Sequence, residues 1–296
     1  MIATGRAYAR AALAGNPSDG YGGAVLSVTI RDFCAEVDLA HSHEAAIDAE
    51  AAELIGAAVA RFERSLGREE SRAYRAACRT TIPRQVGLAG SSAILVACLR
   101  ALCELHGVEM EANEVAQLAW RAETEDMEYP AGGQDPYSQS HGGLVLMDFG
   151  DNVRVERLDP ASLPPLFLAS RADASSPSRG VHTDLRARLG SDGGAVRTAI
   201  GELAELAHEA ARRLRAGDGS SIGELMSATF EIRRRIITLD PRQERMVLIA
   251  RDHGAHTNYA GSGGAVIGTR PAGDAWPALR AALEAEACSV IEPTLG

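Results

Sequence analysis

The segment PRQVGLAGSSA, at residues 83–93, runs directly into an apolar stretch that extends to residue 106. A glycine-rich turn that opens a helix leaves several backbone N–H groups unpaired, and the helix dipole adds partial positive charge. Such a turn can cradle a phosphate, and the hydroxyl of Ser92 can reach a Mg²⁺ that bridges phosphates. A serine N-cap after a glycine turn would give the same pattern without any ligand. The segment is not a Walker A loop, because the chain contains no lysine.

Two further glycine-rich segments lie on either side of this loop in the chain. Residues 10–23, RAALAGNPSDGYGG, place a turn between two apolar strands, and residues 254–265, GAHTNYAGSGGA, lead into a third strand. Alone, the first is most often a hairpin with Asp19 as a turn former, and the second is an ordinary loop. In the functional interpretation, Asp19 accepts hydrogen bonds from sugar hydroxyls, and the backbone of the second segment approaches a ligand closely.

The composition of the 296 residues excludes several classes of function. A net charge of −10 argues against broad binding to nucleic acid or anionic membranes. All 30 basic residues are arginine, so Schiff-base chemistry and a phosphate-binding lysine are excluded. The five cysteines are scattered and odd in number, which favours reduced thiols over disulfides or a zinc site. Neither a leader nor an apolar run of ~18 residues is present, so we expect a cytoplasmic protein.

Hydrophobic patterning predicts alternating strands and helices, which indicates an α+β fold in two lobes. The predicted strands span residues 24–31, 34–39, 143–148, 153–157, 164–170 and 264–269. The predicted helices span residues 44–66, 93–106, 111–125, 195–216, 221–236, 241–253 and 275–287. The polar stretch 171–194 is predicted to be the longest loop. A boundary near residue 160 would divide the chain into domains of residues 1–160 and 161–296.

The order of the three glycine-rich segments decides their interpretation. An N-terminal turn with an aspartate, then P-x-x-x-G-L-x-G-S-S-A before a helix, then G-S-G-G-A resemble the three motifs of the GHMP kinase superfamily. The resemblance extends from about Tyr8 to Gly268. Within the superfamily, G-N-P-S-D at residues 15–19, I-P-R-Q-V-G-L at 82–88 and Q-D-P-Y at 134–137 look most like glucuronokinases. The resemblance implies a ribosomal-protein-S5-like N-terminal domain and a ferredoxin-like C-terminal domain.

The resemblance also implies which residues carry the chemistry. Asp135 falls where these kinases have an aspartate that orients or deprotonates the accepting hydroxyl. Arg10 matches the arginine near it, which would keep that carboxylate ionised. Ser92 and Glu123 form the implied Mg²⁺ pair, because Glu123 precedes the aspartate by the spacing found in galactokinases. Glu125 could take the place of Glu123, and a solvated helix end is the alternative without a metal.

The remaining implied contacts are with the nucleotide and the sugar. The nucleotide-binding set consists of Pro83, Gly87, Leu88, Ala89, Gly90, Ser91, Ser92, Ala93, Gly261, Ser262 and Gly263. The sugar-binding set consists of Asn16, Asp19, Tyr21, Arg84, Gln134 and Tyr137. A uronate carboxylate is best held by a guanidinium, for which Arg84 is one candidate and Arg75 or Arg79 are others. Arg84 could equally pair with a surface carboxylate or touch the nucleotide.

Two positions depart from the family pattern: Ala260 stands where Thr or Ser is usual, and Asn258 stands where a Lys is common nearby. We still expect an enzyme that uses ATP and Mg²⁺ to phosphorylate the anomeric hydroxyl of a sugar acid, giving glucuronate 1-phosphate. A kinase of another sugar or small alcohol and a non-catalytic sugar and ATP sensor are the alternatives. The expected partners are the sugar and ATP, without nucleic acid or membrane, and the pattern indicates no oligomeric state.

Overall fold

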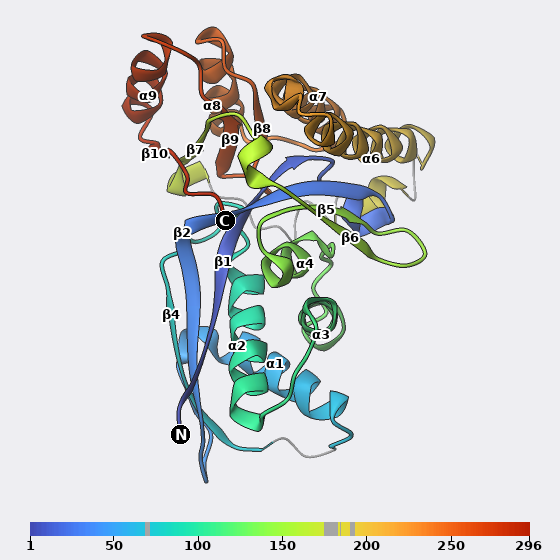
Figure 1. Cartoon of the computed structure of the whole chain (residues 1–296), viewed down its shortest axis with the longest axis vertical. Coiled ribbons are helices and arrows are strands. Elements are labelled where there is room, and N and C mark those ends of the chain that lie inside the picture. The colour runs from blue at the N-terminus through green and yellow to red at the C-terminus, as the bar shows by residue number, and fades with distance from the viewer. Residues whose placement is uncertain (69–71, 175–182, 184, 190–192) are drawn as a thin grey trace.

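The structure is a computed structural model that describes residues 1–68, 72–174, 183, 185–189 and 193–296. Within these residues, the first half of the chain forms a six-stranded sheet and the second half a four-stranded sheet, with helices packed against them (Figure 1). This mixed architecture confirms the predicted α+β class. The boundary predicted near residue 160 lies just before the first strand of the second sheet, and it stays a prediction.

The larger sheet is organised around one long strand, β2 (Ala24–His41). β1 (Ala3–Ala14) pairs with β2 along most of its length, while β4 pairs with its C-terminal half and β5 with its N-terminal half. The strand order is β3-β4-β2-β5-β6, with β1 beside β2. The remaining strands are β3 (Ala46–Ile47), β4 (Tyr74–Thr80), β5 (Leu144–Asp148) and β6 (Arg154–Leu158).

The prediction of two separate strands over residues 24–31 and 34–39 was wrong, because β2 continues through the interval. The register of β1 against β2 shifts between Tyr8 and Ala9, which leaves residues 31–33 of β2 without partners on β1. These residues form an irregular bulge that turns polar side chains outward without ending the strand. The interval between the two predicted strands is therefore a bulge within one strand.

Helix α2 (Gly90–His106) packs directly on β1 and β2, and three helices surround it: α1 (Ala52–Ser65), α3 (Ala112–Arg121) and α4 (Gln134–His141). The helix predicted over 44–66 begins later than expected, because residues 46–47 pair with β4 as β3. The helix predicted over 111–125 ends in a π-helical turn, Ala122–Asp126.

The second half of the chain forms an antiparallel sheet in the order β10-β7-β9-β8. Its strands are β7 (Leu166–Ser170), β8 (Thr257–Tyr259), β9 (Ala265–Thr269) and β10 (Ser289–Ile291). Its helices are α6 (Gly193–Arg215), α7 (Ile222–Ile236), α8 (Pro241–Asp252) and α9 (Ala275–Ala285). Half of the loop predicted over 171–194 lies outside the described residues, and residues 185–189, which are described, are helical instead.

β1 joins the two sheets at its C-terminal end. The backbone N–H of Ala12 donates to the carbonyl of Ala260, just after β8, at 2.9 Å. The amide of Asn258, which is fully buried, donates to the carbonyl of Leu13 at 3.3 Å and to Oδ1 of Asn16 at 2.8 Å. The first and third glycine-rich segments are therefore neighbours in space, although they lie at opposite ends of the chain.

β1 also approaches α2 closely at Gly5. A Cβ added there would lie 1.8 Å from the backbone oxygen of Ala97, which no real side chain tolerates. The backbone of α2 can approach β1 this closely only where the strand has a glycine. Gly5 therefore fixes the distance between α2 and the strand that carries Arg10.

We expect Gly5→Ala to lower the free energy of unfolding by about 2–3 kcal/mol, because the backbone of α2 must move away from β1. Gly56→Ala is the matched control, since Gly56 lies within α1 and an added Cβ meets nothing within 4 Å. That change should leave stability unchanged or raise it by about 0.5–1 kcal/mol. Urea denaturation of both variants measures the difference. Equal stability of Gly5→Ala and the wild type would contradict the close packing.

Candidate active site

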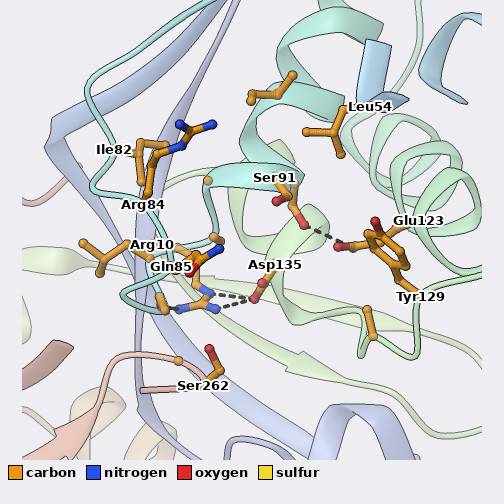
Figure 2. Close-up of a pocket in the computed structure, with 18 of the residues that line it drawn as sticks. Arg10, Leu54, Ile82, Arg84, Gln85, Ser91, Glu123, Tyr129, Asp135 and Ser262 are labelled. Carbon is orange, nitrogen blue, oxygen red and sulfur yellow. Dashed lines mark hydrogen bonds and ion pairs between the residues drawn. The ribbon is translucent and has the colours of Figure 1, made fainter. Parts of the chain in front are cut away.

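A cavity of about 690 Å³ lies where the N-terminal end of α2, the start of α4 and the turn after β8 converge (Figure 2). All three glycine-rich segments contribute to its wall. The predicted residues that line it are Arg10, Asn16, Asp19, Pro83, Arg84, Gly87, Leu88, Ala89, Gly90, Ser91, Ser92, Glu123, Gln134, Asp135, Gly261 and Ser262. Two predicted nucleotide contacts, Ala93 and Gly263, lie next to this lining rather than in it.

The loop before α2 has the backbone conformation of an anion site. Its φ angle is positive at alternate residues, with 56° at Gln85, 76° at Gly87 and 63° at Ala89. Alternation of right-handed and left-handed residues is typical of backbone nests, whose N–H groups converge on an anion. α2 begins at Gly90, so the positive end of its dipole lies beside this nest. A left-handed non-glycine residue costs of order 1 kcal/mol or more, which favours a functional reason for the two that occur here.

The loop contacts the turn after β8 through bare backbone. A Cβ on Gly261 would lie 2.1 Å from the carbonyl oxygen of Gly87, and a Cβ on Gly87 would lie 3.0 Å from the amide nitrogen of Ser262. Glycine is therefore required on both sides of the contact. The second and third motifs thus form one continuous backbone surface at the cavity.

Arg10, on β1, connects this surface to α4. Its guanidinium donates to Oδ1 of Asp135 from Nε at 2.7 Å and pairs with it from Nη2 at 2.6 Å (Figure 2). Its Nη1 donates to the carbonyls of Gly87, at 2.9 Å, and of Ala260. The Arg10 side chain is 3% exposed, whereas that of Asp135 is 28% exposed. The arginine is thus a fixed, buried support, and the carboxylate faces the cavity.

Ser92 and Glu123 meet on the opposite side of the cavity from Arg10. Ser92, in the first turn of α2, donates from Oγ to Oε2 of Glu123 at 3.2 Å. Glu123 belongs to the π-helical turn after α3, a distortion that is frequent at functional sites. Burial, together with the nearby charge of Asp135, raises the pKa of Glu123 to about 8. Its carboxyl group is therefore poised to gain or lose a proton near neutral pH.

The alternative carboxylate, Glu125, faces the surface. It forms ion pairs with Arg61 and Arg121, each at 2.8 Å, and its side chain is 48% exposed. The structure thus brings Glu123 to Ser92 and leaves Glu125 in a solvated network.

Asp19 holds the start of α4. Its Oδ2 accepts from the backbone N–H of Gln134 and its Oδ1 from Nε2 of the same residue, both at 3.1 Å. A Cβ on Gly132 would lie 1.8 Å from Oδ2 of Asp19, so the chain before α4 needs glycine here. Asp19 is 2% exposed, and burial raises its pKa to about 6. The nearby charge of Asp135 raises this pKa further, against the lowering effect of the Gln134 N–H.

Two predicted sugar contacts do not reach the cavity. Among the described residues, Tyr21 packs with the cluster that includes Ile236, and its side chain does not line the cavity. Tyr137 is buried among aromatic rings, with Trp120 and Phe149 at ring-centroid distances of 6.3 and 5.6 Å. Direct contact of either tyrosine with the substrate is therefore a prediction that the structure does not support.

The arginines predicted to hold a carboxylate face solvent. Arg84 lines the rim of the cavity, but its side chain is 75% exposed and pairs with Glu50 at 3.4 Å. Arg79 pairs with Asp38 at 2.8 Å on the sheet surface, and Arg75 is exposed on the same strand. A carboxylate bound inside the cavity needs another partner.

The sequence analysis missed Arg233, which lines the cavity from α7. It belongs to a run of three arginines at residues 233–235, a pattern that is typical of a solvated helix face. The departures at Asn258 and Ala260 also have a structural explanation. The side chain of Asn258 hydrogen-bonds β8 to Asn16 in the first motif. At residue 260 it is the backbone carbonyl, and not a side chain, that accepts a hydrogen bond from Arg10.

Comparison with known proteins agrees with this geometry. Residues 53–143 match the family model described as GHMP kinases N terminal domain. The chain is 32% identical to Glucuronokinase 1 of Arabidopsis thaliana, over 90% of this chain and 85% of that protein. The chain belongs to the GHMP kinase family. The similarity to glucuronokinases that the motifs predicted is thereby confirmed.

Solved structures share the fold of this GHMP kinase. The phosphomevalonate kinase of Streptococcus pneumoniae, in complex with phosphomevalonate and AMPPNP, superposes with a TM-score of 0.83 at 14% identity, over 99% of both chains. The galactokinase of Lactococcus lactis, complexed with galactose, superposes with a TM-score of 0.82 at 15% identity. That match covers 100% of this chain and 94% of the galactokinase. The predicted two-lobed GHMP kinase fold is confirmed. Within the described residues, none of the helices has the length and apolar character needed to span a membrane.

The burial of Asp19 predicts how stability depends on pH. Its pKa is about 6 in the folded protein and 3.8 for an ordinary aspartate, so its ionisation destabilises the fold as pH rises from about 4 to above 6. Asp19→Asn does not ionise and can still accept from the Gln134 N–H. We expect this variant to gain about 2–3 kcal/mol over the wild type at pH 7.5 and almost nothing at pH 4. Urea unfolding at both pH values measures this, and a pH-independent difference would contradict it.

Proposed function

We propose that this GHMP kinase transfers the γ-phosphoryl group of ATP to the anomeric hydroxyl of a sugar acid, with glucuronate as the substrate. The observation that carries the proposal is the position of Asp135. Its carboxylate faces the cavity beside the nest of residues 83–93, and a buried arginine that also binds Gly87 holds it there. A phosphoryl acceptor and a triphosphate require this juxtaposition of base and anion site.

The transfer needs an aimed nucleophile and charge neutralisation more than covalent help. The C1 hydroxyl oxygen forms a bond to the γ-phosphorus while the bond to the β–γ bridging oxygen breaks. The electron pair of that bond leaves with ADP, and the hydroxyl proton passes to the Asp135 carboxylate. Arg10 keeps that carboxylate in place and supplies positive charge at the reacting centre. Asp19 and Gln134 would bind sugar hydroxyls.

The residues opposite Arg10 fit a Mg²⁺ ion. Ser92 Oγ and the Glu123 carboxylate are hard oxygen donors, and Mg²⁺ is usually held by one or two carboxylates together with substrate phosphates. Among the described residues, Glu123 has no ion-pair partner, and burial raises its pKa to about 8. A buried carboxyl group that has no cationic partner in the protein is suited to bind a metal ion. When bound, Mg²⁺ would neutralise the phosphates and favour the ionised form of Glu123.

Similarity supports the choice of ligands. The chain is 32% and 33% identical to two Arabidopsis thaliana proteins named Glucuronokinase 1 and Probable glucuronokinase 2, over 90% of its length in both cases. The structure of the galactokinase contains galactose, and that of the phosphomevalonate kinase contains AMPPNP. These similarities support the proposal that the cavity binds a sugar acid and ATP.

The role of Asp135 predicts a selective loss of turnover. Asp135→Asn keeps an oxygen that can accept from Arg10 but cannot take a proton, so kcat should fall by about 10²–10⁴-fold. The Kd for ATP should stay within about twofold, because Asp135 is not a phosphate ligand. Asp173→Asn is the control, since Asp173 pairs with Arg171 at 2.6 Å on the surface. Kinetics of ADP release and equilibrium titration with ATP measure both quantities. Equal activity of Asp135→Asn and the wild type would remove Asp135 from the mechanism.

The substrate is tested by Mg²⁺-dependent ADP release from ATP with glucuronate, galacturonate, galactose, glucose, mevalonate and homoserine. We expect release with glucuronate above all others, and a product whose phosphate is on C1 by phosphorus NMR. Release with a neutral sugar alone would keep the kinase mechanism and discard the sugar acid. Binding of ATP without release for any compound would favour a sensor that retains the fold.

A further inference from the structure

Arg233 is the largest side chain that is fully buried in the described structure, at 1% exposure. Its Nη1 donates to the carbonyl of Tyr259 at 3.2 Å and its Nη2 to the carbonyl of Gly261 at 2.7 Å. Its Nε has no hydrogen-bond partner, and within the described part of the chain no carboxylate pairs with it at 4 Å or less. Burying a guanidinium without a counter-charge costs several kcal/mol, so its retention calls for a functional reason.

The neighbouring arginines show that Arg233 is exceptional. Arg234 is 44% exposed and pairs with Glu231 and Glu244, and Arg235 is 56% exposed and pairs with Glu202. The interpretation as a solvated helix face holds for these two. Arg233 alone turns inward, toward the cavity wall. Burial lowers the pKa of Arg233 to about 10, so the side chain is still cationic at neutral pH.

The wall around Arg233 has a regular arrangement. Three consecutive carbonyls, those of residues 259, 260 and 261, bind in turn Arg233, Arg10 and Arg233. Two buried guanidinium groups therefore lie along one wall of the cavity. Asp135 neutralises Arg10, whereas the charge of Arg233 acts on Asp19, whose two oxygens already accept from Gln134. Arg233 therefore lacks a direct ion pair within the described residues, and its Nε remains without a hydrogen-bond acceptor at the cavity.

We propose that Arg233 is a specificity-determining residue that binds the carboxylate of the sugar-acid substrate. The inference rests on the proposed function and replaces Arg84, which lies at the rim and pairs with Glu50. In the pyranose form of a hexuronate the carboxylate is on C5, and the ring oxygen separates C5 from the C1 that carries the reacting hydroxyl. Arg233 lines the same cavity as Asp135 and is linked to Arg10 through the consecutive carbonyls of residues 259–261. Because the guanidinium is shielded from water, a carboxylate that reaches it forms stronger hydrogen bonds than at an exposed arginine.

The test compares glucuronate with glucuronamide, which has the same shape and lacks the negative charge. In Arg233→Met the KM for glucuronate should rise by about 10- to 100-fold, because charge-assisted hydrogen bonds to the substrate are lost. The KM for glucuronamide and the KM for ATP should each stay within about threefold, and kcat for glucuronate should change little. The selectivity of the wild type for glucuronate over glucuronamide should therefore disappear.

Arg234→Met is the matched control, because it makes the same substitution one residue further along α7 at an exposed ion pair. It should keep the wild-type selectivity. Arg233→Lys keeps the charge but not the planar fork, and should show an intermediate KM for glucuronate. If Arg233→Met does not fold, as judged by circular dichroism, Arg233→Lys supports the same comparison.

These measurements distinguish a failure of the role assigned to Arg233 from a failure of the proposed function. A wild-type enzyme that turns over no uronate overturns both. If the wild type uses glucuronate and Arg233→Met raises the KM for glucuronate and glucuronamide equally, the role of Arg233 is structural, and only the inference fails. A rise confined to the KM for ATP would assign Arg233 to a phosphate and would likewise overturn the inference. A loss of selectivity in Arg84→Met but not in Arg233→Met would return the role to Arg84.

Discussion

The buried guanidinium of Arg10 is the interaction on which the site depends. Its donors are shared among a carboxylate at the start of α4, a carbonyl of the loop before α2 and a carbonyl of the turn after β8. Loss of the carboxylate would leave a buried cation unpaired, which typically costs about 3–5 kcal/mol, and loss of either carbonyl would leave a buried donor unsatisfied, at about 1–3 kcal/mol. The three segments therefore cannot move independently. A single side chain on β1 thus holds base, anion site and C-terminal turn in one arrangement.

Small residues make that arrangement possible. The cavity wall is built largely from backbone groups, and backbone can approach backbone only where no Cβ intervenes, as at Gly87 and Gly261. The same requirement recurs at Gly5, where α2 settles onto β1, and at Gly132, beside Asp19. Part of the glycine content of the chain therefore follows from the construction of the site. Larger residues at these points would separate the segments that Arg10 joins.

Features formed by consecutive residues were predicted best from the sequence. The loop before α2 is contiguous, so its glycines, serines and following helix could be recognised together, and the structure places nearly all of them at the cavity. Side-chain direction depends on packing between distant elements, which no local pattern records. Tyr137 lies two residues after Asp135, and yet it turns into an aromatic cluster. Arg84 precedes the loop and faces solvent, whereas Arg233, hidden in an arginine run, turns inward.

The distribution of charge in the cavity lowers the stability of the folded protein and favours the binding of charged ligands. Two of its acids, Asp19 and Glu123, have pKa values raised by burial, and Arg233 has a pKa lowered by burial. Each shift means that the surrounding protein disfavours the charged form. Such groups lower the stability of the fold and strengthen interactions with a ligand of opposite charge in the same water-poor space. Arg10 and Asp135 satisfy each other and form the rigid centre. Glu123 and Arg233 have no ion-pair partner within the described structure, and theirs are the charges that ligands would neutralise.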